Sequence, residues 1–267
     1  MTSAGTTVVI GGGMMGEALF AGALAAGAST EDVVVVERVP ERAAQLREKH
    51  KIEVTDDAGV VARASAVVVA VKPYDVVAVL HEIGPHLSPS TLVISVAAGV
   101  RLAAIEGALP DGVPVVRVMP NTPALVGQGI SALSPGSDCS PQDLERARLL
   151  LATSGRTVVV PESQQDAVTA VSGSGPAYVY YVADAMIEAG VMLGLTRATS
   201  TELTVQTLLG AATMLSETGT HPVLLREAVT SPGGTTAEAL RQLDTHGVRA
   251  AFLAAMEACR DKSRSLG

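Results

Sequence analysis

Aromatic side chains are scarce in this chain of 267 residues: they make up 2% of it, and tryptophan is absent. Nucleic-acid-binding surfaces usually combine basic patches with aromatic side chains on which bases stack. Here the formal net charge is −8, from 27 acidic residues against 19 lysines and arginines. The composition therefore argues against nucleic acid as a partner.

Cysteine is also nearly absent. Cys139 and Cys259 are the only two, they lie far apart, and neither has a histidine or second cysteine at metal-ligand spacing. Disulfide frameworks and zinc sites need more cysteines in closer patterns. We expect no disulfide, no metal site and a reducing compartment.

Long hydrophobic runs are missing as well, although 48% of the residues are apolar. A membrane-spanning helix needs about 20 consecutive apolar residues. The N-terminal segment lacks the charged stretch and cleavage site of a signal peptide. We expect a cytoplasmic protein that does not associate with membranes.

Glycine, in contrast, forms a clear pattern near the N-terminus. Thr6–Ile10 has the pattern of a short β-strand, residues 11–16 match G-x-G-x-x-G, and a helical pattern covers residues 17–26. In this setting the three glycines make a tight turn, let a pyrophosphate approach the helix N-terminus and let the helix pack on the strand. The pattern predicts a dinucleotide site. The expected contacts in this glycine-rich loop (residues 11–16) are Gly11, Gly13, Met14, Met15 and Gly16.

The next predicted strand, Val33–Val36, ends where dinucleotide-binding folds carry a ribose-binding acid. Glu37 can accept hydrogen bonds from a ribose 2′-hydroxyl, as in NADH. Arg38 can instead pair with the 2′-phosphate of NADPH. The two residues favour different cofactors, so we predict that NADPH is used and that NADH is also accepted.

Strand and helix patterns alternate up to about Glu162. Valine-rich strands separated by helices predict a parallel sheet covered on both faces, with ligands bound at the carboxyl ends of its strands. The predicted strands cover residues 8–10, 33–36, 66–71, 92–96, 115–119 and 157–160. The predicted helices between them cover residues 42–50, 58–63, 76–81, 102–108 and 141–154.

Beyond Glu162 only helical spacing remains, over residues 166–193, 199–217, 223–230, 236–243 and 248–264. Gly173, Gly175 and Pro176 should kink or split the first of these helices. We expect Ser174 and Gly175 to permit close packing of the kinked helix against cofactor and partner. The predicted fold is α/β: a Rossmann-type parallel sheet domain over residues 1–162 that binds a dinucleotide, followed by an all-α dimerisation and substrate domain over residues 163–267.

A second unusual segment, residues 228–236, lies between two of the late helical patterns. It contains four hydroxyl side chains and a Gly-Gly pair, and Pro232 and Gly233 should break any helix. A turn that leads into a helix leaves backbone N–H groups unpaired, which can hold a carboxylate that glycine allows to approach closely. The alternative is an ordinary Gly-Pro loop with a Ser or Thr N-cap.

These motifs together resemble the pyrroline-5-carboxylate reductase family. The resemblance runs from Gly11 to the C-terminal helix, in the family's order. The glycine-rich block is shared by many dehydrogenases, whereas the last two blocks together are highly specific. The five blocks are residues 11–16, Ala70-Val71-Lys72-Pro73, Met119-Pro120-Asn121-Thr122-Pro123, Ser172-Gly173-Ser174-Gly175-Pro176-Ala177-Tyr178 and Ser231-Pro232-Gly233-Gly234-Thr235-Thr236.

The resemblance implies reduction of 1-pyrroline-5-carboxylate to L-proline, the last step of proline biosynthesis, by a nicotinamide cofactor. It implies that Thr236 places its hydroxyl near the imine nitrogen, and that Ser231 and the backbone of Gly234 and Thr235 hold the carboxylate. Thr230 stands where the family often has Asn, which puts its contact in question. A cyclic imine is easily protonated, and the loop contains no His, Asp or Glu. The implied substrate contacts are Thr230, Ser231, Gly233, Gly234, Thr235 and Thr236.

At the strand ends, the resemblance implies cofactor contacts from Ala70, Val71, Lys72, Pro73, Ala97 and Ala98. Lys72 is either a cofactor contact, which we favour, or a residue that fixes its own loop. For Asn121 we favour a role in ordering its loop through bonds from its side chain to the backbone.

Two other function classes remain open. A 3-hydroxyacid dehydrogenase would share the two-domain plan, but it usually needs a Lys or His base after the domain boundary, and residues 166–181 contain neither. A nucleotide-sensing scaffold without turnover would not need a hydroxyl-rich loop.

The helical region, about 100 residues, is small for an independent core. Its apolar surplus predicts a homodimer, and the resemblance implies interlocked helical domains, with the substrate loop of one subunit approaching the cofactor held by the other. A higher assembly of dimers is compatible with it. The residues expected to be covered by a second copy are Tyr178, Tyr181, Met186, Leu208, Leu209 and Met214.

Overall fold

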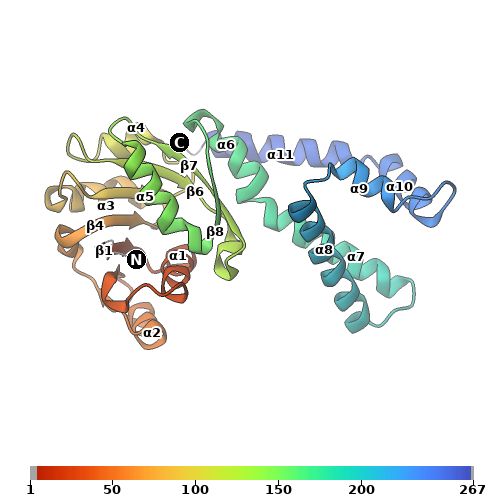
Figure 1. Ribbon diagram of the computed structural model, residues 1–267, viewed down its shortest axis with the longest axis horizontal. Helices are drawn as coiled ribbons and strands as arrows, with labels where there is room; N and C mark the ends of the chain where they lie inside the picture. Colours follow the sequence, from red (N-terminus) through yellow and green to blue (C-terminus); the bar gives the residue numbers. More distant parts are fainter. Residues whose placement is uncertain (1–4, 266–267) are drawn as a thin grey trace. The chain divides into compact units, whose positions relative to one another are not determined.

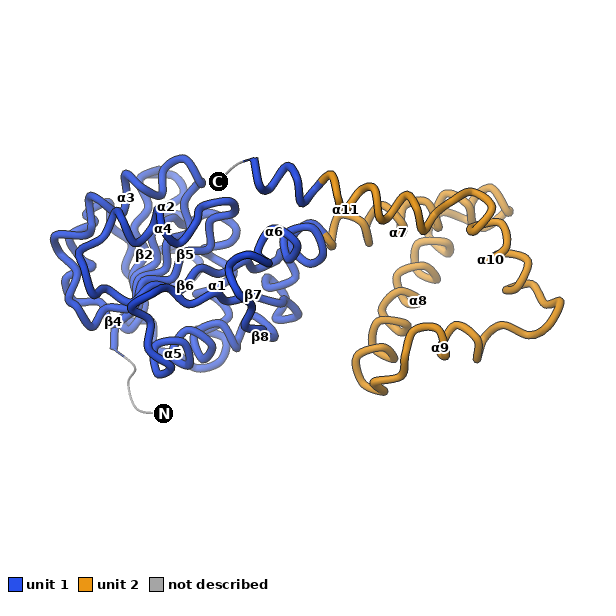
Figure 2. Tube along the Cα trace, turned by 90° about the horizontal axis from the view of Figure 1, so that it is seen from above, with its two compact units in different colours: residues 1–174, 259–267 blue, residues 175–258 orange. Residues whose placement is uncertain are grey.

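The computed structural model describes residues 5–265, and the chain divides into two compact units (Figure 1, Figure 2). Unit 1 comprises residues 1–174 and 259–267, and unit 2 comprises residues 175–258. The last helix, α11 (Val248–Arg264), starts in unit 2 and ends in unit 1. The domain boundary expected after residue 162 stays a prediction, because the present division follows compactness and falls at Ser174.

Unit 1 is built on an eight-stranded sheet with the order β3-β2-β1-β4-β5-β6-β7-β8. All six predicted strands form: β1 (Thr6–Ile10), β2 (Val33–Val36), β4 (Ala64–Val69), β5 (Leu92–Ser95), β6 (Val115–Met119) and β8 (Gly155–Val159). Two strands were not predicted, β3 (Glu53–Thr55) and β7 (Gly129–Pro135). β7 runs antiparallel to β6, and β8 runs parallel to β7, so the sheet is mostly and not wholly parallel.

Helices cover both faces of this sheet, as predicted. Successive strand residues point to opposite faces, so Val8 and Ile10 of β1 lie in one core cluster and Val9 lies in the other. On the Val9 face pack α1 (Met14–Ala25), α2 (Pro40–His50) and α5 (Pro141–Leu151). On the opposite face pack α3 (Val76–Ile83), α4 (Leu102–Glu106) and residues 58–63, which form a 3₁₀ segment and not the expected α-helix.

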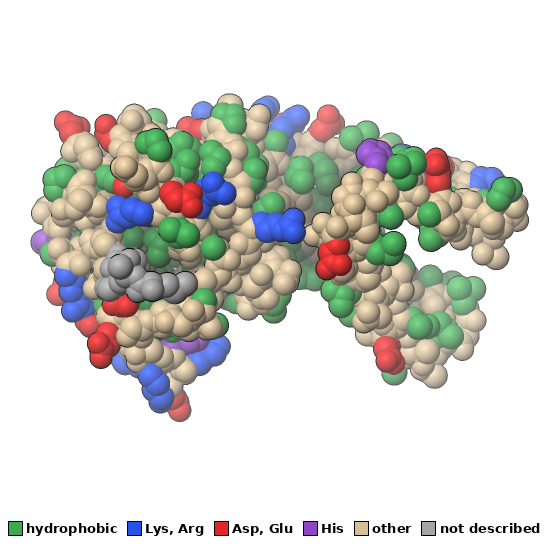
Figure 3. All heavy atoms as spheres, in the orientation of Figure 1, with side chains coloured by type: hydrophobic (Ala, Val, Ile, Leu, Met, Phe, Trp, Pro, Cys, Tyr) green, Lys and Arg blue, Asp and Glu red, His purple; other side chains and the backbone are tan. Residues whose placement is uncertain are grey.

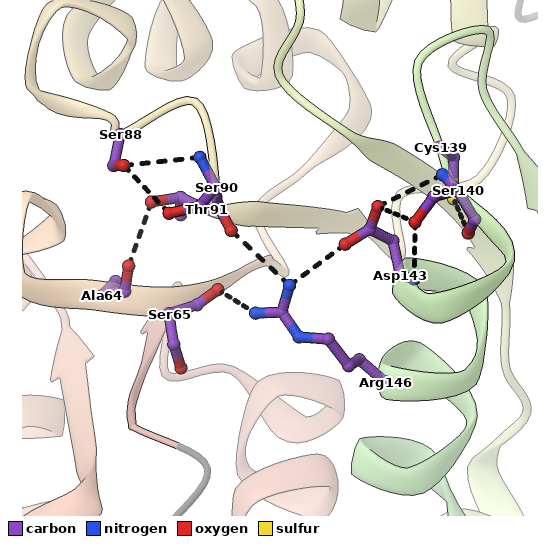
Figure 4. Close-up of polar contacts among 9 residues, drawn as sticks. All are labelled: Ala64, Ser65, Ser88, Ser90, Thr91, Cys139, Ser140, Asp143 and Arg146. Carbon is purple, nitrogen blue, oxygen red and sulfur yellow. Dashed lines mark hydrogen bonds and ion pairs between the residues drawn. The ribbon is translucent and has the colours of Figure 1, made fainter.

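At the amino ends of the central strands, polar groups satisfy one another. Arg146 of α5 donates from Nη2 to the Ser65 carbonyl oxygen at 2.7 Å and pairs with Asp143 at 3.0 Å (Figure 4). Asp143 and Ser140 form a capping box at the start of α5. These contacts tie α5 to β4 at this edge, which lies opposite the edge predicted to bind ligands.

The first long predicted helix is interrupted, as its glycines suggest. The Ser174 N–H donates to the Thr169 carbonyl oxygen, five residues earlier, at 2.8 Å. A Cβ at Gly173 would lie 2.5 Å from Met119 Cε, whereas a Cβ at Gly175 would meet no described atom within 4 Å. The close packing of Ser174 and Gly175 against cofactor and partner therefore stays a prediction. The segments are α6 (Gln165–Val168), a π-helical turn (Thr169–Gly173) and α7 (Gly175–Met192).

Unit 2 is entirely helical and carries its apolar residues on its surface. Its elements are α7, α8 (Arg197–Thr218), α9 (Pro222–Ala228), α10 (Thr235–Thr245) and most of α11. None of its hydrophobic side chains is buried among the described residues; only Ser200 and Thr204 are. Ser200 Oγ donates to the Ile187 carbonyl oxygen at 2.8 Å and so joins α8 to α7. Hydrophobic side chains reach the surface in Figure 3.

The residues expected to be covered by a second copy differ in exposure. Tyr181 is 79% exposed, Leu209 59% and Met214 54%, and Met186 is also exposed. Tyr178 and Leu208 are half-buried. None of the helices in the described part of the chain is both long and apolar enough to cross a membrane.

Candidate functional site

The glycine-rich loop connects β1 to α1 at the carboxyl edge of the sheet. Gly11 has φ +100°, and a Cβ there would lie 2.7 Å from the Ala70 carbonyl oxygen. A Cβ on Gly16 would collide with the Gly11 carbonyl oxygen. Gly13 is the N-cap of α1 without a side-chain cap, and a Cβ on it would meet no described atom within 4 Å. The loop therefore turns at Gly11, packs at Gly16 and leaves open space beside Gly13.

The predicted ribose-binding acid is held against this loop. Glu37 accepts the Gly12 N–H through Oε2 at 2.9 Å and the Val39 N–H through Oε1 at 2.8 Å. Arg42 of α2, which was not predicted, donates from Nε to the Gly12 carbonyl oxygen at 2.7 Å. Both backbone polar groups of Gly12 thus bind side chains that follow β2.

Arg38, predicted to meet a 2′-phosphate, has another partner in this structure. Its Nη2 lies 2.7 Å and 2.5 Å from the two carboxylate oxygens of Glu82 in α3. The two side chains are 62% and 45% exposed, and exposed pairs of this kind contribute only about 0–1 kcal/mol. The pair can therefore open at little cost.

The other predicted cofactor residues follow β4 and β5, which lie beside β1 in the sheet. Ala70 and Val71 are half-buried against the two cores, and Ala97 is buried while Ala98 is partly exposed. Lys72 and Pro73 are exposed, and Pro73 starts a 3₁₀ turn. The Lys72 carbonyl oxygen accepts the Asp75 N–H at 2.9 Å, while its side chain forms no hydrogen bond or ion pair within the described residues. Its contact with the cofactor stays a prediction. Unit 1 therefore brings its predicted residues to one edge.

Asn121 joins the end of β6 to two other segments. Its Oδ1 accepts the Ile130 N–H at 2.9 Å, which orders the connection to β7, as predicted. Its Nδ2 also donates to the Ser172 carbonyl oxygen in the π-helical turn at 3.1 Å. Glu162 accepts the Leu102 N–H at the start of α4 at 2.6 Å and pairs with buried Arg117 at 2.8 Å.

The predicted substrate residues form the turn between α9 and α10 in unit 2. Gly233 has φ +65°, and the Gly234 N–H donates to the Ser231 carbonyl oxygen at 3.0 Å. Gly234 is the N-cap of α10 and provides no side-chain cap, so the alternative of a Ser or Thr N-cap is wrong. Within the described chain, the hydroxyls of Ser231, Thr235 and Thr236 make no hydrogen bond. The N–H groups of the first helical turn also lack an acceptor one turn earlier.

Thr230 differs from these residues. Its hydroxyl donates to the Arg226 carbonyl oxygen at 2.6 Å and so stabilises the end of α9. Of the six predicted substrate residues, only Thr230 lines the cavity of about 790 Å³ between α9, α10 and α11. This cavity is walled by apolar side chains, including Leu240 and Phe252, and by arginines such as Arg249.

Charged side chains occur near this turn, because Arg226, Glu227 and Asp244 line the cavity together with Thr230. No group of His, Cys, Asp or Glu side chains in the described residues could hold a metal ion. Both cysteines are free, and burial, followed by the nearby Asp143 carboxylate, raises the pKa of the Cys139 thiol to about 11.

Known proteins share this arrangement over the full chain. Residues 162–266 match the family model for pyrroline-5-carboxylate reductase dimerisation, and residues 6–99 match the model described as NADP oxidoreductase, coenzyme F420-dependent. The chain is 47% identical over 266 residues to pyrroline-5-carboxylate reductase of Corynebacterium melassecola, covering 98% of each chain. The chain belongs to the pyrroline-5-carboxylate reductase family.

Solved pyrroline-5-carboxylate reductase structures agree with this assignment. The enzyme from Coxiella burnetii is 35% identical with a TM-score of 0.93, covering 99% of each chain. The enzyme from Plasmodium falciparum, solved with NADP bound, is 30% identical with a TM-score of 0.88, covering 98% of each chain. Prephenate dehydrogenase from A. aeolicus shares the fold at 13% identity and a TM-score of 0.57. The alternative of another two-domain dehydrogenase is thus a likeness of fold alone.

Proposed function

We propose that this chain reduces 1-pyrroline-5-carboxylate to L-proline with a hydride from NAD(P)H. The observation that carries the proposal is the 231–236 turn, whose hydroxyls are unpaired at the start of α10, in a chain that belongs to this reductase family throughout its length. A scaffold without turnover would have no use for such a turn.

The reaction adds a hydride to the imine carbon and leaves a proton on the nitrogen, so that the C=N bond becomes CH–NH. NAD(P)H supplies the hydride when bound. In our proposal the Thr236 hydroxyl donates a hydrogen bond to the imine nitrogen and orients the ring. No strong general acid is required, because the imine is basic enough to be protonated from water.

The substrate carboxylate binds, in this proposal, at the start of α10. The N–H groups of Thr235 and Thr236 and the Ser231 hydroxyl are hydrogen-bond donors on one turn, and the helix N-terminus favours an anion. Gly233 and Gly234 allow the ligand to approach the backbone closely. Thr230 contributes indirectly, because its hydroxyl already holds the end of α9.

The residues of unit 1 suit a dinucleotide. Open space at Gly13 and the N-terminus of α1 fit a pyrophosphate, and Glu37 lies beside the loop where a ribose hydroxyl would bind. We propose that NADPH and NADH are both used: Glu37 accepts from the 2′-hydroxyl of NADH, and Arg38 leaves Glu82 to pair with the 2′-phosphate of NADPH. Ala70 to Pro73, Ala97 and Ala98 line the same edge.

We further propose that unit 2 pairs with a second copy, since its exposed apolar side chains belong to a region that matches the family's dimerisation model. Sedimentation at micromolar concentration tests this pairing, and the same profile would reveal an association of dimers. A cytoplasmic location remains a prediction from the two free cysteines, and cell fractionation tests it.

The activity is tested by mixing the purified chain with NADPH or NADH and 1-pyrroline-5-carboxylate. We expect oxidation of the cofactor and an equal amount of L-proline, detected by chromatography. If the chain bound the cofactor but formed no proline, the reductase proposal would be refuted and a nucleotide-sensing protein would be the remaining interpretation. Oxidation of L-proline without reduction of the imine would refute the proposed direction.

A further inference from the structure

A charged layer lies directly behind the glycine-rich loop. Arg42, in the first turn of α2, donates from Nε to the Gly12 carbonyl oxygen at 2.7 Å. Its Nη2 forms an ion pair with Glu17 of α1. The two side chains are only 29% and 13% exposed, so this pair is better shielded from solvent than those at the surface of the protein. Arg42 therefore links the loop to the first turn of α1.

Glu17 is itself held from the other end of α2. Lys49 Nζ and His50 Nε2 each lie 2.8 Å from Glu17 Oε1. Burial opposes ionisation of Glu17, but the hydrogen bonds from Lys49, His50 and Arg42 outweigh it and lower the pKa of this carboxyl to about 2. Glu17 thus stays ionised at neutral pH and is a fixed anchor for the Arg42 guanidinium.

Among the residues that the structure describes, only Arg42 donates a hydrogen bond to the Gly12 carbonyl oxygen. Gly12 lies between Gly11 and Gly13, and glycine backbones adopt many conformations. Its N–H is bound by Glu37 at 2.9 Å and its carbonyl by Arg42 at 2.7 Å. These two side chains determine the orientation of the peptide groups that lead into Gly13. Gly13 is the N-cap of α1 and has open space beside it, which suits a pyrophosphate at this helix N-terminus.

We propose that Arg42 is a positioning residue for the dinucleotide: by holding the Gly12 carbonyl against α1, it keeps the glycine-rich loop in the form that binds the pyrophosphate. The inference rests on the proposed function only for the identity of the cofactor. Because the pyrophosphate is common to NADH and NADPH, the loss of Arg42 should weaken both equally. A direct contact of Arg42 with the 2′-phosphate would instead affect NADPH alone.

A matched control exists on the same helix. Arg47 donates from Nε and Nη2 to the Val54 carbonyl oxygen in β3, at 3.1 Å and 2.6 Å. Like Arg42, Arg47 ties α2 to a neighbouring segment, but its partner is β3, and it forms no hydrogen bond or ion pair with Gly12 or Glu17. Arg47→Gln therefore reports the cost of loosening α2 without disturbing the loop.

The test measures the Kd of NADH and of NADPH by titration of nucleotide fluorescence, without substrate, in Arg42→Gln, Arg42→Lys and Arg47→Gln. We expect Arg42→Gln to raise both Kd values by about tenfold to thirtyfold, since a charge-assisted bond to the loop is lost. Arg47→Gln should leave both Kd values within about twofold of the wild-type values. It should lower Tm about as much as Arg42→Gln does. Arg42→Lys keeps the charge beside Glu17 but loses the fork that reaches two acceptors, so it should be intermediate.

Turnover supplies a second readout. In Arg42→Gln the KM for the cofactor should rise while kcat at saturating cofactor stays within about threefold. Unchanged Kd values in Arg42→Gln, or equal losses in Arg47→Gln, would refute the positioning role. Should Arg42→Gln fail to fold, the milder Arg42→Lys decides by the same comparison. Wild-type protein that binds both nucleotides but makes no proline would refute the proposed reaction and leave the Arg42 inference standing.

Discussion

The two units of this chain treat apolar side chains in opposite ways. Unit 1 buries its valines and leucines in two clusters, one on each face of the sheet. In unit 2 no hydrophobic side chain is buried among the described residues, and Leu209 and Met214 are more than half exposed. A sheet between two helix layers completes its own core, whereas five helices with apolar faces need a partner. The difference indicates that unit 1 completes its core by itself and that unit 2 is completed by a second copy.

The largest expected effect breaks the pairing of unit 2. Leu209→Glu places a charge on the exposed apolar face of α8, where burial against a second copy would make it very costly. We expect the dissociation constant of the dimer to rise by more than about a hundredfold and the activity to be lost. Leu149→Glu is the matched control, because Leu149 is 66% exposed on α5 of unit 1. Analytical ultracentrifugation decides, and an unaltered dimer in Leu209→Glu would show that this face of α8 is open to solvent.

A mixing experiment asks whether each active site draws on two chains, as the family resemblance implies. Gly13→Glu is sterically possible, since no described atom lies within 4 Å of a Cβ there, but its carboxylate would repel a pyrophosphate. Thr236→Val disables the other unit. Co-refolded at equal amounts, the two variants should regain about a quarter of wild-type activity, because half of the dimers are mixed and each has one intact site. A mixture that is no more active than Thr236→Val alone would place each site within one chain.

Thr236→Val by itself tests the substrate turn. The change removes the hydroxyl and keeps the shape, so kcat/KM for the imine should fall by roughly one to two orders of magnitude, as for a lost hydrogen bond at a desolvated site. Thr235→Val is a useful comparison, because Thr235 contributes its N–H rather than its hydroxyl in our proposal. Nucleotide Kd and Tm should change little in either variant. Wild-type turnover in Thr236→Val would remove Thr236 from the mechanism.

The acid stability of unit 1 tests the Glu17 anchor. The pKa of Glu17 is lowered from 4.5 to about 2, so its contribution is complete above pH 4.5 and is lost as the pH falls toward 2. Between these values the wild type should lose roughly 2 kcal/mol of unfolding free energy through this group. Urea denaturation at several pH values measures it. In Glu17→Gln the decline over this range should be shallower, and parallel declines would mean that Glu17 is not the group responsible.

The smallest expected effect concerns cofactor choice. Arg38→Ala should raise the Kd of NADPH by about tenfold, because a charge-assisted bond to the 2′-phosphate is lost. The Kd of NADH should stay within about twofold of the wild-type value. Glu82→Gln releases Arg38 from its surface pair and should slightly improve NADPH binding. Kd titrations with both nucleotides provide the comparison. Equal losses for NADH and NADPH in Arg38→Ala would show that Arg38 does not meet the phosphate.

The strands that were predicted and those that were missed show how far local patterns reach. β2 is four consecutive valines, which no helix-period pattern explains, and it forms as expected. β3 has three residues and β7 is rich in small residues, so neither carries a strong signal. Each is stabilised mainly by the neighbour that it pairs with. The antiparallel direction of β7 could not be predicted from sequence either, because it also depends on the strand with which β7 pairs.

The residues of the candidate site also fall into those that the sequence predicted and those that it did not. The glycines of residues 11–16 and the turn at 231–236 were found from sequence because special backbone conformations need special residues. Arg42 and Glu82 were missed, because an arginine or glutamate on a helix usually lies in solvent and its partner is distant in the chain.

The sequence by itself determined the dinucleotide loop, the valine strands, the helical second half and the hydroxyl turn, because each depends on neighbouring residues and on backbone preferences that they impose. Only the tertiary structure decided that Glu37 and Arg42 hold Gly12 from opposite sides, that Arg38 pairs with Glu82, and that Asn121 reaches Ser172. These contacts join residues 25 to 51 positions apart. Which distant side chains meet follows from the packing of whole helices against the sheet, and no local pattern contains that information.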